Sequence, residues 1–457
     1  MTTLIILTAI GLSCLFAEIL GFKKFLHVLV LAGLVGALIT TVLDWGTNAP
    51  YFNDMVLMDN FSLAFTGLLI ILSLLWFIMS PVFFEEPSSK TDHYALIIFA
   101  LVGAQLMASF SNMLILFLGI EILSICLYVL AGSRKSNLAS NEAALKYFLL
   151  GAFATGFLLF GIALIYGATG SFNIQQISAY FLENSSQPSS LALAGTLLIL
   201  TAMAFKISAV PFHFWAPDVY QGSPTVVTAF MSTVVKTAAF AAMFRLFQDA
   251  FQSIFSVWEN TIWVIVVATI LLGNVTAVFQ TNFKRMLAYS SIAHAGYMLM
   301  SVLAITPGSS SALFFYTAAY SLSSITAFAV LLLLSRKSGD ESIGVFRGMA
   351  RSNPFLAGIT IVAMLSLAGI PPLAGFFAKY YIFSATMQAG YTSLVLVAIL
   401  GSLIGVFYYF RVIIALFDKE TDQTSIESSV SFNALLLITA LAAVALGLAP
   451  GLIAGII

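Results

Sequence analysis

The amino-acid sequence predicts an all-α polytopic membrane protein. Hydrophobic residues make up 61% of the 457 residues and charged residues only 8%, whereas a soluble domain is about 45–50% apolar and about 25% charged. The apolar runs are continuous over about 20 residues, which is the length that crosses a bilayer as a helix. Such runs exclude an outer-membrane barrel, whose strands alternate between apolar and polar residues.

The chain contains about 14 apolar runs of roughly 20 residues. Their approximate limits are 3–20, 25–43, 61–80, 94–110, 113–131, 143–166, 190–210, 224–247, 261–280, 285–304, 311–334, 354–389, 393–416 and 432–455. The longest polar loops, 44–60, 81–93, 167–189, 335–353 and 417–431, are too short to form a separate domain. Residues 171–187 fit either a short amphipathic surface helix or a solvated loop.

Lys and Arg residues predict the orientation of the spans. The loops after spans 1, 3, 5, 9, 11 and 13 contain Lys23, Lys24, Lys90, Arg134, Lys135, Lys284, Arg285, Arg336, Lys337, Arg347, Arg351 and Lys419. The loops after even-numbered spans contain almost none, with Arg245 at the end of span 8 as the exception. Because positive loops face the cytoplasm, both termini are expected on the periplasmic side of a bacterial inner membrane.

Two spans must be broken. The run 354–389 has 36 residues and would extend about 54 Å as one helix, against about 30 Å of hydrocarbon. Its centre reads LAGIPPLAG (367–375), and Ala209-Val-Pro211 interrupts the seventh span in the same way. Paired broken helices predict two repeats of five spans, inverted relative to each other because five is odd. The expected units are residues 1–93 (helices 1–3), 94–247 (repeat one), 261–416 (repeat two) and 432–457 (helix 14).

Several ionisable side chains lie at mid-span, where each costs several kcal/mol (about 2.5–3.5 on insertion scales) unless it faces water or a partner. They are Glu121, Lys206, Lys236 and Lys379, and their depth favours a functional role as carriers along a proton wire. For His213 and His294, a satisfied core histidine is an equal alternative. Lys146 can also form an ordinary i,i+4 pair with Glu142.

Other polar residues have structural interpretations. Glu18 is expected to form a surface ion pair with Lys23 or Lys24, and the two cysteines, Cys14 and Cys126, are expected to pack in apolar segments. Trp215, Asp218 and Tyr220 are expected to cap or brace the broken seventh helix. The polar side chains of span 11 fit a water path between Lys236 and Lys379 or, equally, helix-packing hydrogen bonds; they are Tyr316, Thr317, Tyr320, Ser321, Ser323, Ser324 and Thr326.

Three stretches carry a family resemblance. FKISAVPFHFWAPDVYQGSPTVVTAFMSTVVKTAAF (205–240) closely resembles the signature of the antiporter-like membrane subunits of respiratory complex I. EAALKYFLLGAFATGFLLFGIALIYGATG (142–170) is similar to the subunit N branch of that family, and LAGIPPLAGFFAKYYIF (367–383) resembles its broken twelfth helix. A lysine at position 379, where subunit M has a glutamate, argues against M. The end of the chain at Ile457, without a long lateral helix, argues against L.

The resemblance implies 14 helices, two inverted repeats and a set of residue roles. It pairs Glu121 with Lys206, makes Lys236 the central lysine, and makes Lys379 the terminal lysine on the outward side. It also adds Lys146 to the proton-transfer residues. The partners it implies are lipid and other complex I membrane subunits, M-like on one side and K- and J-like on the other, with no nucleic acid.

Three functional hypotheses follow from the sequence. The first is a proton-translocating, non-redox subunit of NADH:quinone oxidoreductase, since the chain lacks nucleotide and iron–sulfur motifs. It has no cofactor of its own, and flavin, iron–sulfur clusters and quinone are expected in other subunits. The second is a cation/proton antiporter subunit of the multi-subunit Mrp type, which shares these motifs. The third is a structural scaffold whose mid-membrane lysines are dispensable.

Overall fold

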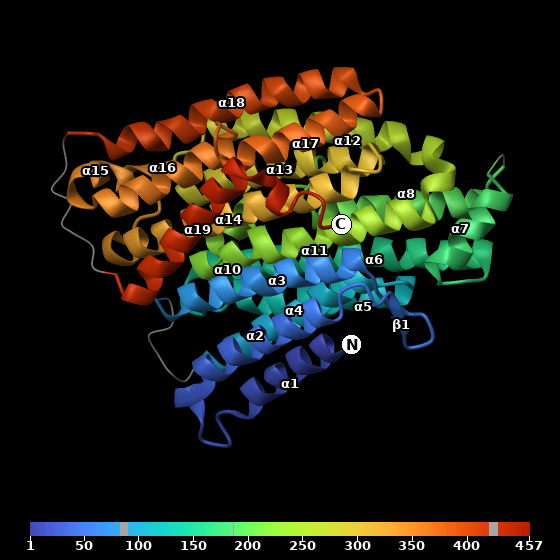
Figure 1. Cartoon of the computed structure of the whole chain (residues 1–457), viewed down its shortest axis with the longest axis horizontal. Coiled ribbons are helices and arrows are strands. Elements are labelled where there is room, and N and C mark those ends of the chain that lie inside the picture. The colour runs from blue at the N-terminus through green and yellow to red at the C-terminus, as the bar shows by residue number, and fades with distance from the viewer. Residues whose placement is uncertain (83–89, 186, 420–427) are drawn as a thin grey trace.

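The computed structural model describes residues 1–82, 90–185, 187–419 and 428–457. Parts of the expected segments 81–93, 171–187 and 417–431 therefore lie outside the described residues. Helices dominate the described chain and run side by side in one elongated bundle (Figure 1). The first helices are α1 (Thr2–Phe16), α2 (Leu26–Leu43), α3 (Asn60–Met79), α4 (Lys90–Ser109), α5 (Met113–Ala131), α6 (Leu138–Thr169), α7 (Ile174–Glu183), α8 (Ser190–Lys206), α9 (Trp215–Gly222), α10 (Thr225–Phe230) and α11 (Lys236–Arg245).

The later helices are α12 (Phe255–Val278), α13 (Phe283–Leu303), α14 (Ser309–Ser338), α15 (Met349–Ser352), α16 (Pro354–Ala368), α17 (Ala374–Gln388), α18 (Thr392–Leu416) and α19 (Val430–Leu448). Among the described residues, 11 helical segments are long and apolar enough to cross a membrane, and α1, α8 and α16 are shorter apolar helices. The predicted class, a mostly helical multi-pass membrane protein, is confirmed.

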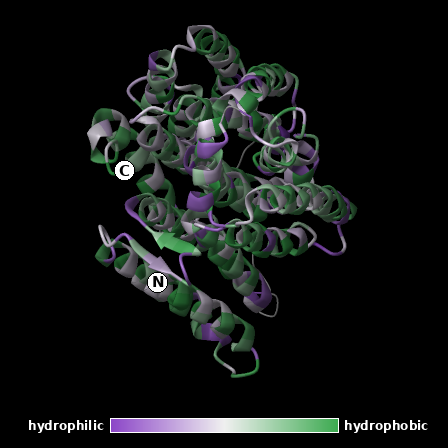
Figure 2. Ribbon diagram, turned by 90° about the vertical axis from the view of Figure 1, so that its right-hand side faces the viewer, coloured by the Kyte–Doolittle hydropathy of each residue, from purple (hydrophilic) through white to green (hydrophobic). Residues whose placement is uncertain are grey.

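The helices divide into a buried centre and an exposed perimeter. The most apolar windows of Thr225–Ala250 and α14 are 100% buried, whereas those of Lys23–Leu43 and α6 are only 28% and 33% buried. Hydrophobic colour nevertheless predominates along most helices, outer ones included (Figure 2). A helix that is apolar on all its faces is stable in hydrocarbon. The outer helices therefore face lipid, and the central ones are shielded from it.

Both predicted helix breaks are present. α8 ends at Lys206 and α9 begins at Trp215, while α16 ends at Ala368 and α17 begins at Ala374. Gly369 closes α16 with a φ of 83°, a left-handed conformation that glycine adopts without steric cost. The two lysines next to the breaks therefore sit where backbone groups are free to take other partners.

The eighth span is not a uniform helix. A π-helical turn, Met231–Val235, separates α10 from α11, and a second one, Leu246–Ala250, follows α11. The sequence predicts 224–247 as one continuous span, because a π turn needs no Gly or Pro and leaves no signal in composition. Such turns are frequent at functional sites, and the first one ends directly before Lys236.

Four further expectations from the sequence concern two loops, an ion pair and the two cysteines. The expected loop 44–60 contains an antiparallel hairpin, β1 (Ala49–Tyr51) with β2 (Val56–Met58), whose three-residue strands are too short to show an alternating pattern. Segment 171–187 contains the short helix α7, which confirms the helical alternative. The expected ion pair between Glu18 and Lys23 is present. Both cysteines are buried.

Candidate proton-transfer site

Lys236 lies at the centre of the bundle. Lys236 is only 4% exposed. Its Nζ donates to the Ser291 carbonyl at 2.6 Å and to the Ser291 hydroxyl. The ammonium also lies 5.9 Å from the centre of the Tyr320 ring. These neutral oxygens, together with the π face, solvate the charge in place of water. Lys236 of α11 is thereby joined to Ser291 of α13.

His294 lies one turn beyond Ser291 on α13. It is 4% exposed, and its ring shares hydrogen bonds with the Tyr316 hydroxyl at 2.7 Å and the Tyr409 hydroxyl at 3.1 Å. Tyr409 of α18 is in turn hydrogen-bonded to Ser290. Both ring nitrogens of His294 therefore have hydroxyl partners, an arrangement in which a proton can be accepted at one nitrogen and released at the other.

Lys379 occupies the second helix break. It is 7% exposed, and its Nζ donates to the Ala368 carbonyl and to the Ser402 hydroxyl, each at 2.8 Å. Ala368 is the last residue of α16, so the lysine donates a hydrogen bond to one of the carbonyls that a helix end leaves without a partner. The ammonium also lies 5.4 Å from the centre of the Tyr297 ring.

Lys206 ends α8 at the first break. Its Nζ donates to the Ser124 hydroxyl at 2.7 Å, while Thr155 donates to Glu121 Oε1 at 2.7 Å. Within the described part of the chain, no ion pair joins Glu121 to Lys206. The direct pair that the resemblance implies is replaced here by contacts of each residue with a hydroxyl group.

Lys146 and His213 lie apart from this group. The side chain of Lys146 is 40% exposed and pairs with Asp218 and with Glu142, each at 2.7 Å. Asp218 also accepts from Arg285 at 2.8 Å, so it braces the second half of the broken helix as expected. His213 is 5% exposed, and its Nδ1 has no hydrogen-bond partner in the part of the chain that the structure describes.

The polar side chains of α14 fit two interpretations: some adjoin the proton-transfer residues, and others form hydrogen bonds between packed helices. Tyr316 contacts His294, and Tyr320 faces Lys236. Ser323 donates to Ser366, and Thr326 donates to Thr439, each at 2.8 Å. The first two hydroxyl-bearing rings adjoin titratable groups, whereas the last two bonds attach α14 to α16 and α19.

Two buried cations were overlooked in the sequence. Arg245 and Lys284 are each 2% exposed in their side chains, although the sequence assigns Lys284 to a loop and Arg245 to the end of span 8. Arg245 pairs with Asp59 at 2.6 Å, and Lys284 pairs with Glu341 at 3.0 Å. Because the acidic partners are 186 and 57 residues away, only the fold could reveal these pairs.

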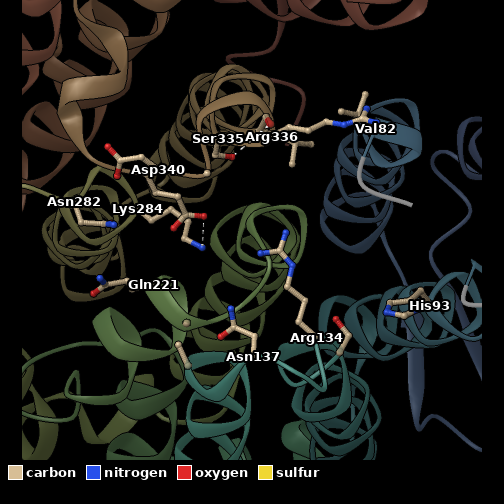
Figure 3. A pocket seen from close by; sticks show the side chains of 16 residues that line it. Val82, His93, Arg134, Asn137, Gln221, Asn282, Lys284, Ser335, Arg336 and Asp340 are labelled. Atoms are coloured by element: carbon tan, nitrogen blue, oxygen red, sulfur yellow. Dashed lines mark hydrogen bonds and ion pairs between the residues drawn. The ribbon is translucent and has the colours of Figure 1, made fainter. Parts of the chain in front are cut away.

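The Lys284–Glu341 pair adjoins a large polar cavity of about 810 Å³. The side chains around it come from segments far apart in the sequence, among them Arg134, Lys284 and Arg336 (Figure 3). On its rim, hydrogen bonds from the Ser342 hydroxyl and backbone hold the pKa of Asp340 below its usual value. The cavity lies at the end of the bundle where α13 begins.

A bundle of this kind defines a class of protein: a polytopic helical transporter whose protonatable groups lie within its membrane-spanning helices, two of them next to helix breaks, with hydroxyl and carbonyl groups as partners. In the described residues, no group of three or more His, Cys, Asp or Glu side chains is arranged to hold a metal ion. The chemistry that the arrangement can perform is proton transfer between ammonium, imidazole and hydroxyl groups.

Comparison with known proteins identifies the family. Residues 110–405 match the model described as NADH:quinone oxidoreductase/Mrp antiporter, transmembrane. The chain is 43% identical over 455 residues to NADH-quinone oxidoreductase subunit N of Cytophaga hutchinsonii, covering 99% of this chain and 98% of that protein. The chain therefore belongs to the NADH:quinone oxidoreductase/Mrp antiporter family, among the subunit N relatives.

Solved structures agree with this placement. A chain of respiratory complex I from Thermus thermophilus with bound aureothin superposes with a TM-score of 0.85 at 35% identity, covering 98% of both chains. A chain of the Mrp complex from Dietzia gives a TM-score of 0.88 at 21% identity, covering 99% of this chain and 95% of that one. The second likeness concerns the fold alone.

Proposed function

We propose that this chain is a proton-translocating, non-redox membrane-arm subunit of NADH:quinone oxidoreductase. The observation that carries the proposal is the set of the half-buried Lys206 and the buried Lys236, His294 and Lys379, each bonded to a hydroxyl or carbonyl rather than to a carboxylate. A lysine without a tight counter-ion can release and recover its proton as its surroundings change. Full-length relatives that carry the subunit N name support the same function.

Protons would move along the membrane plane through this set. Lys236 and His294 are joined through neighbouring residues of α13, and His294 and Lys379 face the α18 residues Tyr409 and Ser402. A perturbation near Glu121, transmitted from adjacent subunits, would alter the protonation equilibrium of Lys206. Moving one charge against 100 mV requires about 2.3 kcal/mol, which is within reach of one changed electrostatic contact in a poorly solvated interior.

The architecture that accompanies this function comprises 14 spans and two inverted five-helix repeats. In this proposal α4–α6, the broken helix α8–α9 and the helix α10–α11 form repeat one. Helices α12–α14, the broken helix α16–α17 and α18 form repeat two. The matched breaks support the pairing. The termini would lie on the periplasmic side of a bacterial inner membrane, as the distribution of Lys and Arg favours.

The partners proposed are an M-like subunit on one side and K- and J-like subunits on the other. The flavin, iron–sulfur clusters and quinone belong to other subunits of the complex. Lys146 and His213 remain proposed proton carriers. Lys146 is held by its ion pair with Asp218, and His213 belongs to the segment between α8 and α9 that interrupts the helix.

A cation/proton antiporter subunit of the Mrp type is the second candidate, favoured by the match of residues 110–405 to a family model that covers both NADH:quinone oxidoreductase and Mrp antiporter chains. It predicts Na⁺-dependent exchange without NADH oxidation. Co-purification with flavin- and iron–sulfur-containing subunits would support the first proposal over this one.

The proposed function is tested in inverted membrane vesicles that contain the assembled complex. Lys206→Ala, Lys236→Ala and Glu121→Ala should each depress NADH-driven proton uptake while assembly on native gels is retained. Lys24→Ala, at an exposed position near the membrane surface, is the matched control and should pump normally. Undiminished pumping in both Lys206→Ala and Lys236→Ala would favour the scaffold hypothesis instead.

A further inference from the structure

A small, partly open cavity lies beside Lys206. Its volume is about 20 Å³, and a cavity holds a water molecule once it exceeds about 10–15 Å³. The polar residues of its wall are Ser124, Tyr128, Tyr147, Thr155 and Lys206. An apolar cavity of this size would stay dry, but a water molecule is stable where two to four polar partners surround it.

The Tyr147 hydroxyl is the unusual member of this wall. The residue is 2% exposed, and among the described residues its hydroxyl has no hydrogen-bond partner. A buried hydroxyl without a partner costs roughly 1–3 kcal/mol. Since nearly all buried polar groups in proteins are satisfied, an unsatisfied hydroxyl on the wall of a water-sized cavity indicates a bound water.

The ring of Tyr147 cannot turn away to find another partner. It stacks on Trp215 with 4.7 Å between ring centres and 6° between planes, and it meets Tyr128 edge-on at 4.8 Å. Trp215 is itself fixed, because its Nε1 donates to the Phe205 carbonyl at 3.0 Å. The helix break therefore holds the Tyr147 side chain in place through Trp215.

The other polar groups around the cavity supply the remaining partners. The Lys206 ammonium has three N–H groups, and one of them donates to Ser124. Thr155 donates to Glu121, which leaves its oxygen free to accept. Gly151 also lines the cavity, and a Cβ there would lie 2.1 Å from the Tyr128 hydroxyl, so only glycine leaves room for that ring.

We propose that one water molecule occupies this cavity and joins the Tyr147 hydroxyl to the Lys206 ammonium, with Thr155 as its link toward Glu121. Tyr147 is thereby a positioning residue for Lys206. This inference rests on the proposed function, because it describes how Lys206 exchanges its proton. It also explains how Glu121 can influence Lys206 without a direct ion pair.

Tyr147→Phe tests the proposal because it removes the hydroxyl and keeps the ring that packs on Trp215. If the water is bound, the variant should assemble but pump about fivefold more slowly or worse, since a hydrogen bond linked to a charged group is lost. The pH profile of pumping should also shift. If the cavity is dry, the variant loses only an unsatisfied hydroxyl; it should then pump normally with an unchanged pH profile, and the proposal would be overturned.

The matched control is Tyr94→Phe, which removes a buried hydroxyl bonded to Ser80 and His27. None of these three residues lines the cavity beside Lys206. It should leave pumping unchanged. If Tyr147→Phe fails to assemble, a high-resolution map of the wild-type complex decides the matter, because density for water within hydrogen-bond distance of the Tyr147 hydroxyl is required. Impaired Lys206→Ala together with normal Tyr147→Phe would overturn this inference alone and leave the proposed function standing.

Discussion

Val210 donates its backbone N–H to the side-chain oxygen of Thr269 at 2.9 Å, in a buried site. Val210 belongs to the unwound segment between α8 and α9, and Thr269 lies in the middle of α12. A helix break leaves backbone groups that hydrocarbon cannot satisfy, so a side chain from another helix takes over one of them. A residue of the proposed second repeat thus stabilises the break of the first.

Thr269→Val should weaken the break. It preserves the shape of the side chain but leaves the Val210 N–H without a partner, at a cost of about 1–3 kcal/mol. The expected results are a lower apparent melting temperature of the purified complex and reduced pumping, because Lys206 is four residues from the unpaired group. Thr269→Ser keeps the oxygen and should retain both. Equal behaviour of the two variants would show that the hydrogen bond is unimportant.

The Arg245–Asp59 pair should be asymmetric in its response to mutation. The arginine side chain is 2% exposed and the aspartate 28%, so the aspartate can be hydrated when left alone and the arginine cannot. We expect Asp59→Asn to cost about 3 kcal/mol or more and Arg245→Met about 1–3 kcal/mol. Asn keeps a side-chain oxygen for the N-cap of α3, where Asp59 accepts from Ser62. The thermal stability of the two variants is the measurement, and the opposite order would contradict this account.

Gly103 permits α4 and α5 to approach closely. A Cβ at this position would lie 2.6 Å from the Gly119 carbonyl oxygen and 2.7 Å from the Leu123 nitrogen, both of which are backbone atoms. Gly103→Ala should therefore separate the helices and destabilise the subunit by about 1–3 kcal/mol. Gly156→Ala is the control, because a Cβ added at position 156 would have no neighbouring atom within 4 Å. This variant should be neutral. The yield of assembled complex distinguishes them.

Tyr316→Phe should impair proton transfer at His294 without disturbing packing. The change removes the hydroxyl that lies 2.7 Å from the histidine Nδ1, so this nitrogen loses its proton-exchange partner. We expect NADH-driven pumping to fall about fivefold or more. Tyr380→Phe is the control, since Tyr380 is 55% exposed on the outside of the bundle. If both variants pump normally, the route between Lys236 and Lys379 does not pass through His294 and Tyr316.

The sequence by itself determined the class of protein and the places where its helices break. Apolar runs of bilayer length can only be helices, and a proline-containing run that is too long for the membrane must be interrupted near its centre. Lys206, Lys236 and Lys379 stood out for a similar reason, because the cost of an ammonium group depends on depth, and depth follows from position within a run. The short amphipathic helix α7 was one of two open alternatives for the same local stretch.

Only the tertiary structure decided which groups meet. The partners of Lys236, Lys379 and Arg245 are 55, 23 and 186 residues away in the chain, and no local pattern encodes such distances. The same limit explains why the sequence does not predict the burial of Lys284 or the π turn before Lys236. The hydrophobicity of a segment depends only on its own residues, so the sequence predicts which segments span the membrane. Hydrogen bonds between helices depend on which helices pack together, and only the tertiary structure shows this.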